Sequence, residues 1–153
     1  MSKGAVLILG ARSDIAMAVA HRFAKAGYDI QLAARNSESL GTDKSDIELR
    51  YEVAVTLHSF DALNIGSHER FVDDLPQLPA VAVCAVGYMG QQAENERDVQ
   101  AAAQVMRSNF EGPASILGVL ANRFEQRGSG TLVGISSVAG ERGRATNYVY
   151  GSA

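Results

Sequence analysis

The sequence predicts an α/β protein built on a doubly wound parallel sheet, and two observations lead to this fold class. Short runs rich in Val, Ile and Leu recur along the chain, and they are too continuously apolar for strands that face water on one side. Helical patterns lie between these runs, and strand alternating with helix is typical of right-handed crossovers. The 153 residues, 46% of them hydrophobic, suffice for one domain with a core, so we expect a single domain over residues 1–153.

Five runs are strand candidates, which predicts a sheet of at least five strands. The strongest are "AVLILG" at 5–10, "AVAVCAV" at 80–86 and "TLVGISS" at 131–137. Two weaker runs, "YDIQLAA" and "EVAVTLHSF", lie at 28–34 and 52–60.

Apolar residues at steps of three or four predict the helices. One helix runs through 15–26 and ends at Gly27, and a second covers 99–110. Its apolar face continues through 116–124, beyond a Gly-Pro pair. The polar segment 36–50 is either a short helix or a loop.

Composition argues against several functional classes. The net charge is -3 without a long basic run, so we expect no nucleic-acid partner. No membrane span or secretory signal can be read, which predicts a cytoplasmic protein. The three histidines have no partners at metal-ligand spacing, so we expect no metal. The single cysteine, Cys84, lies in an apolar run and is interpreted as a buried structural thiol.

The end of the first strand is a candidate phosphate site. "LILGARSDIAMAVA" reads as a strand, a glycine turn and a helix, and a helix N-terminus presents unpaired N–H groups to an anion. A plain strand–helix turn remains equally open, because only one of the three glycines of the usual dinucleotide fingerprint is present. Arg12 can add positive charge, and we expect Asp14 to cap backbone amides. The candidate cofactor contacts are Gly10, Ala11, Arg12, Ser13, Asp14 and Ile15.

Two further strand ends carry polar residues suited to a nucleotide. Arg35, in "LAARN", suits a 2′-phosphate, although a solvated arginine is the alternative. Asp61, followed by Ala62 in "SFDALN", can accept a hydrogen bond from an adenine amino group. Arg12 and Arg35 together favour NADP(H) over NAD(H).

Three polar residues at the ends of later elements specify the chemistry. Asn109 lies in "MRSNFEGP", Ser137 ends the strand "TLVGISS", and Tyr150 follows thirteen residues later. At these spacings the chain closely resembles the short-chain dehydrogenase/reductase family, whose pattern is a serine closing a strand and then Tyr-x-x-x-Lys. The stretch "SSVAGERGRATNYVYGSA" matches that pattern up to the residue before the lysine. The resemblance implies a Rossmann-like fold and covers the whole chain in order.

The resemblance also implies catalytic roles for these three residues. Tyr150 is the general acid/base, Ser137 orients and polarises the substrate carbonyl, and Asn109 steadies a water in the proton relay. A free tyrosine is a poor base near neutral pH, since its pKa is about 10. In the family a neighbouring lysine and the cationic nicotinamide make such a tyrosine usable in both directions.

At the end of the fourth strand the chain departs from the family. The family motif Asn-Asn-Ala-Gly is replaced by Cys84, Ala85, Val86 and Gly87, so the side-chain amides are lost. Gly87 still allows close approach of a cofactor. We therefore expect Ala85, Val86 and Gly87 to contact the nucleotide, with weaker local anchoring of the sheet.

The family's lysine would be residue 154, one position beyond this sequence. Family members continue with further strands and helices that complete the sheet and close over the substrate. The resemblance therefore implies an amino-terminal, NADP(H)-binding part of a longer enzyme, with low activity by itself.

The expected activity is interconversion of a ketone and a secondary alcohol by an NAD(P)(H)-dependent oxidoreductase. The motifs "SDIA", "AVG" and "SSVAGERGR" are similar to the branch that reduces decaprenylphosphoryl keto-pentoses, which suggests a keto-sugar substrate. The alternative is a non-catalytic dinucleotide-binding module, either a redox sensor or a structural subunit.

By resemblance we also expect the whole protein to be a homodimer or homotetramer. The helix that bears Asn109 commonly forms such an interface in the family. The sequence places an apolar stripe of Ile116, Leu120 and Phe124 beside the small residues Ala114 and Gly118, and we expect this stripe to meet a second copy.

Overall fold

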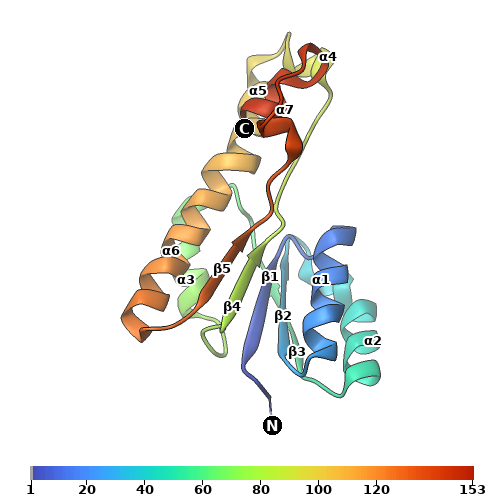
Figure 1. Ribbon diagram of the computed structural model, residues 1–153, viewed down its shortest axis with the longest axis vertical. Coiled ribbons are helices and arrows are strands. Elements are labelled where there is room, and N and C mark those ends of the chain that lie inside the picture. The colour runs from blue at the N-terminus through green and yellow to red at the C-terminus, as the bar shows by residue number, and fades with distance from the viewer. Residues whose placement is uncertain (1) are drawn as a thin grey trace.

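The computed structural model describes residues 2–153, and its centre is a five-stranded parallel sheet (Figure 1). The strands are β1 (Ala5–Leu9), β2 (Asp29–Ala34), β3 (Val55–Ser59), β4 (Val81–Cys84) and β5 (Thr131–Gly134). Their order is β3-β2-β1-β4-β5, so the direction of winding reverses between β1 and β4. All five strand predictions are confirmed, as is the doubly wound α/β fold class.

Helices cover both faces of the sheet (Figure 1). The helices α1 (Asp14–Lys25) and α2 (Gly41–Tyr51) pack on one face, while α3 (His68–Asp73) and α6 (Gly112–Arg127) pack on the other. Three shorter helices gather beyond the carboxyl ends of β4 and β5, namely α4 (Gln92–Asn95), α5 (Val99–Met106) and α7 (Tyr148–Ser152). Short 3₁₀ turns occupy Ser37–Leu40, Ile65–Ser67, Val138–Gly140 and Ala145–Asn147.

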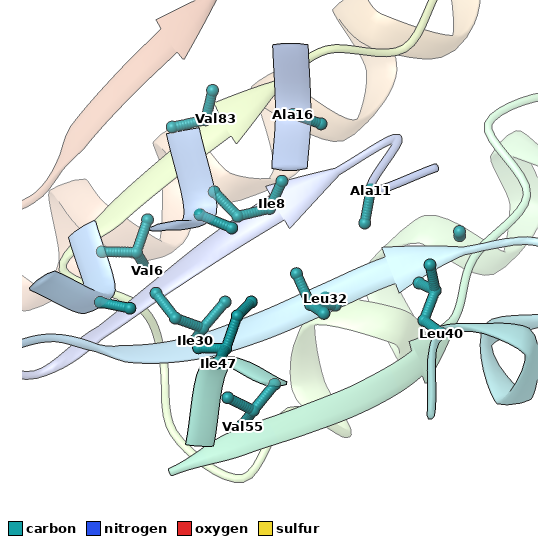
Figure 2. Close-up of a cluster of buried hydrophobic side chains, with 13 residues drawn as sticks. Val6, Ile8, Ala11, Ala16, Ile30, Leu32, Leu40, Ile47, Val55 and Val83 are labelled. Carbon is teal, nitrogen blue, oxygen red and sulfur yellow. The ribbon is translucent and has the colours of Figure 1, made fainter. Parts of the chain in front are cut away.

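The central strand β1 is buried along its whole length, which explains its continuous apolar run. Val6 and Ile8 point into the core beneath α1 and α2, where they meet Ile30 and Leu32 of β2 (Figure 2). Leu7 and Leu9 point into the opposite core beneath α3 and α6. Each such buried side chain contributes about 1.5–3 kcal/mol of transfer free energy.

One long helix runs past the carboxyl end of the sheet. It consists of α5, a π-helical segment (Arg107–Glu111) and α6 in succession, as the apolar face on both sides of Gly112-Pro113 predicts. The π-helical segment ends two residues before Pro113, which has no N–H to donate to the preceding turn.

The structure corrects the assignment of the apolar stripe on α6. Ile116 and Leu120 are fully buried and Phe124 nearly so, in the core against β1 and β4. The stripe therefore packs on the chain's own sheet, and the prediction that it meets a second copy is wrong. A core-facing stripe and an interface stripe have the same helical spacing, so periodicity could not separate them.

The polar segment 36–50, left open by the sequence, forms the 3₁₀ turn Ser37–Leu40 and most of α2. Strand β5 lies at one edge of the sheet, with the side chains of Leu132 and Val133 more than a third exposed. Within residues 2–153, no helix is both long and apolar enough to cross a bilayer.

Candidate active site

The turn after β1 brings the ends of two strands into close contact. Gly10 has a φ of +81°, and a Cβ at this position would lie 2.9 Å from the backbone of Ala85 and Val86. The N–H groups of Gly10 and Ala11 both donate to the carbonyl of Ala33, at 3.0 and 3.1 Å. Only glycine fits here, because both its conformation and the space beside it exclude a side chain.

Helix α1 begins at this turn with its N-terminus beside the strand ends. Ser13 is the N-cap, and its Oγ accepts a hydrogen bond from the N–H of Ala16 at 3.1 Å. The expectation that Asp14 caps these amides is wrong, because Asp14 is already the first helical residue while Ser13 keeps the extended backbone of an N-cap. The Ser13 hydroxyl can still donate a hydrogen bond to a bound anion.

A cleft of about 400 Å³ opens between the strand ends and the long helix. Nine of the twelve residues predicted to contact the cofactor line it: Gly10, Arg12, Ser13, Arg35, Asp61, Ala62, Ala85, Val86 and Gly87. The other three do not line it. Ala11 is buried in the core, and Asp14 and Ile15 are exposed on the first turn of α1.

Arg12 and Arg35 make the cleft electropositive. Both are exposed, and within residues 2–153 neither forms an ion pair or a side-chain hydrogen bond. Asp61 lies on the same cleft, where its Oδ1 accepts from the N–H of Leu63 at 2.9 Å. Two guanidinium groups without partners at one cleft are suited to binding phosphate.

A second, smaller pocket of about 180 Å³ brings together the three residues predicted to be catalytic, Asn109, Ser137 and Tyr150. Val86 lines both this pocket and the larger cleft, so the two adjoin. Ser137 follows β5, and its Oγ accepts from the N–H of Ala139 at 3.2 Å. The Tyr150 side chain projects from α7 without a hydrogen bond to any residue of 2–153.

Close backbone contact holds α7 beside the loop that follows Ser137. A Cβ on Gly151 would lie 2.7 Å from the carbonyl oxygen of Ala139. Gln92 of α4 fixes the other side of this helix, since its Oε1 accepts from the N–H of Val149 at 3.2 Å. Tyr150 is therefore positioned by contacts on both sides of its own turn.

The Asn109 side chain connects the long helix to the segment after β4. Its Oδ1 accepts from the N–H of Tyr88 at 3.0 Å, and its Nδ2 donates to the carbonyls of Tyr88 and Val105. Asn109 lies in the π-helical segment, and its amide reaches the chain that follows β4. These bonds anchor the segment after β4, which lacks the family's asparagine pair.

Six lining residues of the cleft were not predicted: Ala34, Phe60, Leu63, Tyr88, Gln104 and Ser108. Most are sequence neighbours of predicted residues, and Gln104 lies one helical turn before Ser108. Ser108 and Gln104 lie one and five residues from Asn109, so helical spacing from Asn109 does not indicate them, and no chemical feature of the sequence singles out the other four.

The remaining titratable groups suggest no further chemistry at the site. Among residues 2–153, no three or more His, Cys, Asp or Glu side chains are grouped so that they could hold a metal ion. Cys84 is buried at the end of β4, and burial raises the pKa of its thiol, so it is a structural residue.

The doubly wound sheet, with adjoining pockets at its winding reversal, is the architecture of nucleotide-dependent α/β oxidoreductases. The model of the short chain dehydrogenase family matches residues 4–153, and the chain belongs to that family.

Relatives and solved structures agree with this assignment. An uncharacterized oxidoreductase of Mycobacterium tuberculosis is 38% identical over 97% of this chain, and one of Streptomyces coelicolor is 32% identical over 96%. A short-chain dehydrogenase from Sphingobium yanoikuyae, solved in complex with NADPH, has the same fold, with a TM-score of 0.86 at 24% identity over 97% of this chain and 59% of that one. The chain spans 60% of the length of the Mycobacterium relative and 59% of the Streptomyces relative.

Proposed function

We propose that this chain carries the NADP(H)-binding and catalytic residues of an enzyme that interconverts a ketone and a secondary alcohol. One observation carries the proposal. Asn109, Ser137 and Tyr150 come from three separate elements and line one pocket, which adjoins the electropositive cleft at Val86.

The residues of the cleft fit a dinucleotide. Gly10 leaves space that a Cβ would fill, Ser13 and the N-terminus of α1 offer donors, and Arg12 supplies positive charge. Asp61 retains carboxylate lone pairs beyond the one that Leu63 uses, and these can accept from an adenine amino group.

In the proposed reaction, Tyr150 transfers the proton and Ser137 stabilises the charge that develops on the carbonyl oxygen. A nicotinamide bound beside this pocket would supply a hydride to the carbonyl carbon, or would accept one in the reverse direction. Tyr150 would donate its phenolic proton to the carbonyl oxygen as the C=O electron pair moves there. Ser137 donates a hydrogen bond to the same oxygen, a contribution of about 2.7–4 kcal/mol where such a donor was removed from another enzyme.

The proposed role of Asn109 is mainly structural, because its side chain is hydrogen-bonded to the backbone of Tyr88 and Val105. Both Nδ2 hydrogens and one Oδ1 lone pair are used by Tyr88 and Val105. One Oδ1 lone pair remains for the relay water that the family resemblance predicts.

The proposed nucleotide is NADP(H) rather than NAD(H). Arg12 and Arg35 are free to bind a 2′-phosphate, and this supports the preference. The Sphingobium enzyme and an actinorhodin polyketide ketoreductase, both with this fold, were solved with NADPH. The proposed substrate is a polar small molecule such as a keto-sugar. Three charged residues are exposed in the loop after Ser137 and could contact its polar groups: Glu141, Arg142 and Arg144.

The whole protein is proposed to be a homo-oligomer, through a different face of the long helix from the one that periodicity suggested. We define the outer face as the exposed residues at steps of three or four along this helix: Val99, Ala103, Met106, Phe110, Ala114 and Gly118. Large apolar groups and small residues share this face, and the small ones permit close packing of a second helix.

The catalytic proposal is tested with Tyr150→Phe in the whole protein. We expect kcat for NADPH-dependent ketone reduction to fall about 10²–10⁴-fold, because the general acid is lost. The dissociation constant for NADPH should change less than about twofold, since Tyr150 lines the smaller pocket only.

Tyr148→Phe is the matched control, because Tyr148 lies on the same helix without lining either pocket. Its kcat should stay near that of the wild type. Tight NADPH binding without turnover of any ketone or keto-sugar would instead favour a non-catalytic binding module.

A further inference from the structure

We infer that Arg107 and His68 are positioning residues that fix one wall of the cleft, the segment Asp61–Leu63, to the helix bearing Asn109. The inference rests on the proposed function, because it takes the ligand of this wall to be the adenosine part of NADP(H). All three residues of the segment line the cleft.

Three separate contacts hold this segment. The carbonyl of Asp61 accepts from Nε2 of His68 at 3.2 Å, and the carbonyl of Leu63 accepts from the guanidinium of Arg107 at 3.1 Å. Between them, a Cβ on Gly112 would lie 2.6 Å from the carbonyl oxygen of Ala62. The helix therefore touches the segment at each of its three peptide carbonyls, directly or through His68.

His68 transmits this contact through the core. It is fully buried, and its Nδ1 lies 2.9 Å from Oγ of Ser115 on α6. Because a carbonyl can only accept, Nε2 donates to Asp61, and Nδ1 pairs with the Ser115 hydroxyl, which can act as donor or acceptor. The ring also packs against Phe60, with centroids 5.2 Å apart. One side chain thus joins the end of β3, helix α3 and helix α6.

Arg107 reaches the segment from the π-helical turn. Its Nε donates to Glu111 at 2.6 Å, which orients the guanidinium, and a second nitrogen is directed at Leu63. The side chain is half exposed, so its replacement leaves no cavity in the core.

The same helix also holds the opposite wall. Asn109, two residues after Arg107, bonds both backbone groups of Tyr88, which lines the cleft on its β4 side. One rigid helix thereby sets the separation of the two walls. Releasing Leu63 from Arg107 frees only the wall formed by 61–63, so the loss of affinity should be confined to the adenosine part of the ligand.

The test is binding of 2′,5′-ADP, a probe that contains the adenosine and its 2′-phosphate without nicotinamide, measured by calorimetry. For Arg107→Ala we expect about a fivefold to tenfold weaker dissociation constant, with an unchanged melting temperature of the unliganded protein. Arg107→Lys should recover most of the affinity, because its ammonium can donate to the same carbonyl. In the whole protein, KM for NADPH should rise while kcat stays unchanged.

One control variant separates this role from charge. Arg97→Ala removes the same charge from an exposed arginine outside the cleft. It should bind the probe within about twofold of the wild type. His68→Phe, which keeps a ring but removes the donor, should weaken binding as Arg107→Ala does. If this buried variant does not fold, the Arg107 variants still decide.

Wild-type affinity in Arg107→Ala would overturn the inference, as would weaker binding that accompanies a lowered melting temperature. Failure of the wild type to bind either 2′,5′-ADP or NADPH would instead contradict the proposed function.

Discussion

Arg35 is the residue on which the proposed nucleotide preference depends most. It follows β2, lines the cleft and has no partner within residues 2–153, so it is available to a 2′-phosphate. A charge-assisted hydrogen bond contributes about 1.5–3 kcal/mol, or roughly 10–150-fold in affinity. We therefore expect Arg35→Ala to weaken NADPH binding by about that factor and to leave NADH binding almost unchanged.

Titrations with both nucleotides, followed by nicotinamide fluorescence, measure this difference. Arg22→Ala is the matched control, because Arg22 is an exposed arginine on α1 that does not line the cleft. Equal affinities of the wild type for NADPH and NADH would contradict the preference.

Residue types at strand ends were predictable, whereas contacts to the backbone were not. Ser137 and Tyr150 carry a spacing that points to their chemistry, and the structure places them with Asn109 in one pocket. His68 and Arg107 bond to main-chain carbonyls, which every residue possesses, so no partner in the sequence reveals them. Asp14 was the predicted cap, and only the extended backbone conformation of Ser13 shows that Ser13 takes this role.

At the scale of elements, an ion pair between Arg123 of α6 and Asp73 of α3 joins these two helices. Two guanidinium nitrogens lie 2.9 and 3.2 Å from the carboxylate oxygens. Hydrogen bonding to Arg123 lowers the pKa of Asp73 below its usual value. A depressed carboxyl pKa means that this stabilisation is complete above the unfolded-state pKa of about 4 and is lost as pH falls through the folded-state value.

We therefore expect a double-mutant cycle of Asp73→Asn and Arg123→Met to show a coupling free energy at pH 7 that shrinks toward pH 3. The coupling should be small even at pH 7, since both side chains are partly exposed. Urea unfolding of the four proteins at each pH measures it. A coupling that is the same at both pH values would show that the ion pair does not act on stability as described.

The elements that the sequence could not indicate are short or unusual. Helices α3 and α4 have six and four residues, too few for an apolar periodicity to be recognised. The π-helical segment has about one extra residue per turn, and the apolar periodicity of α5 and α6 on either side shows no visible break at this point. Strands β1, β2 and β4, by contrast, were predictable because burial on both faces demands continuous apolar runs. Strand β5 has a similar run, but the expectation that it is covered on both faces is wrong, since all four of its residues are exposed.

At the scale of the molecule, the fold places all the proposed chemistry at one end of the sheet. The cleft lies where winding reverses between β1 and β4, and the smaller pocket lies between β5, α7 and the long helix. Helices lie on both faces of the sheet (Figure 1), although β5 at its edge stays exposed. The outer face of the long helix is a further exposed apolar surface.

This outer face underlies the last prediction, which concerns assembly. Phe110 is 67% exposed and Val99 78% exposed, with the small residues Ala103 and Ala114 at helical spacing beside them. We expect the whole protein to be a dimer or tetramer at micromolar concentration, and Phe110→Glu to dissociate it by burying a charge without a partner. Light scattering measures the mass. Leu49→Glu is the control, because Leu49 is 87% exposed on α2, on the opposite side of the sheet, and should leave the mass unchanged. A monomeric wild type, or an oligomer indifferent to Phe110→Glu, would show that copies do not associate through this face.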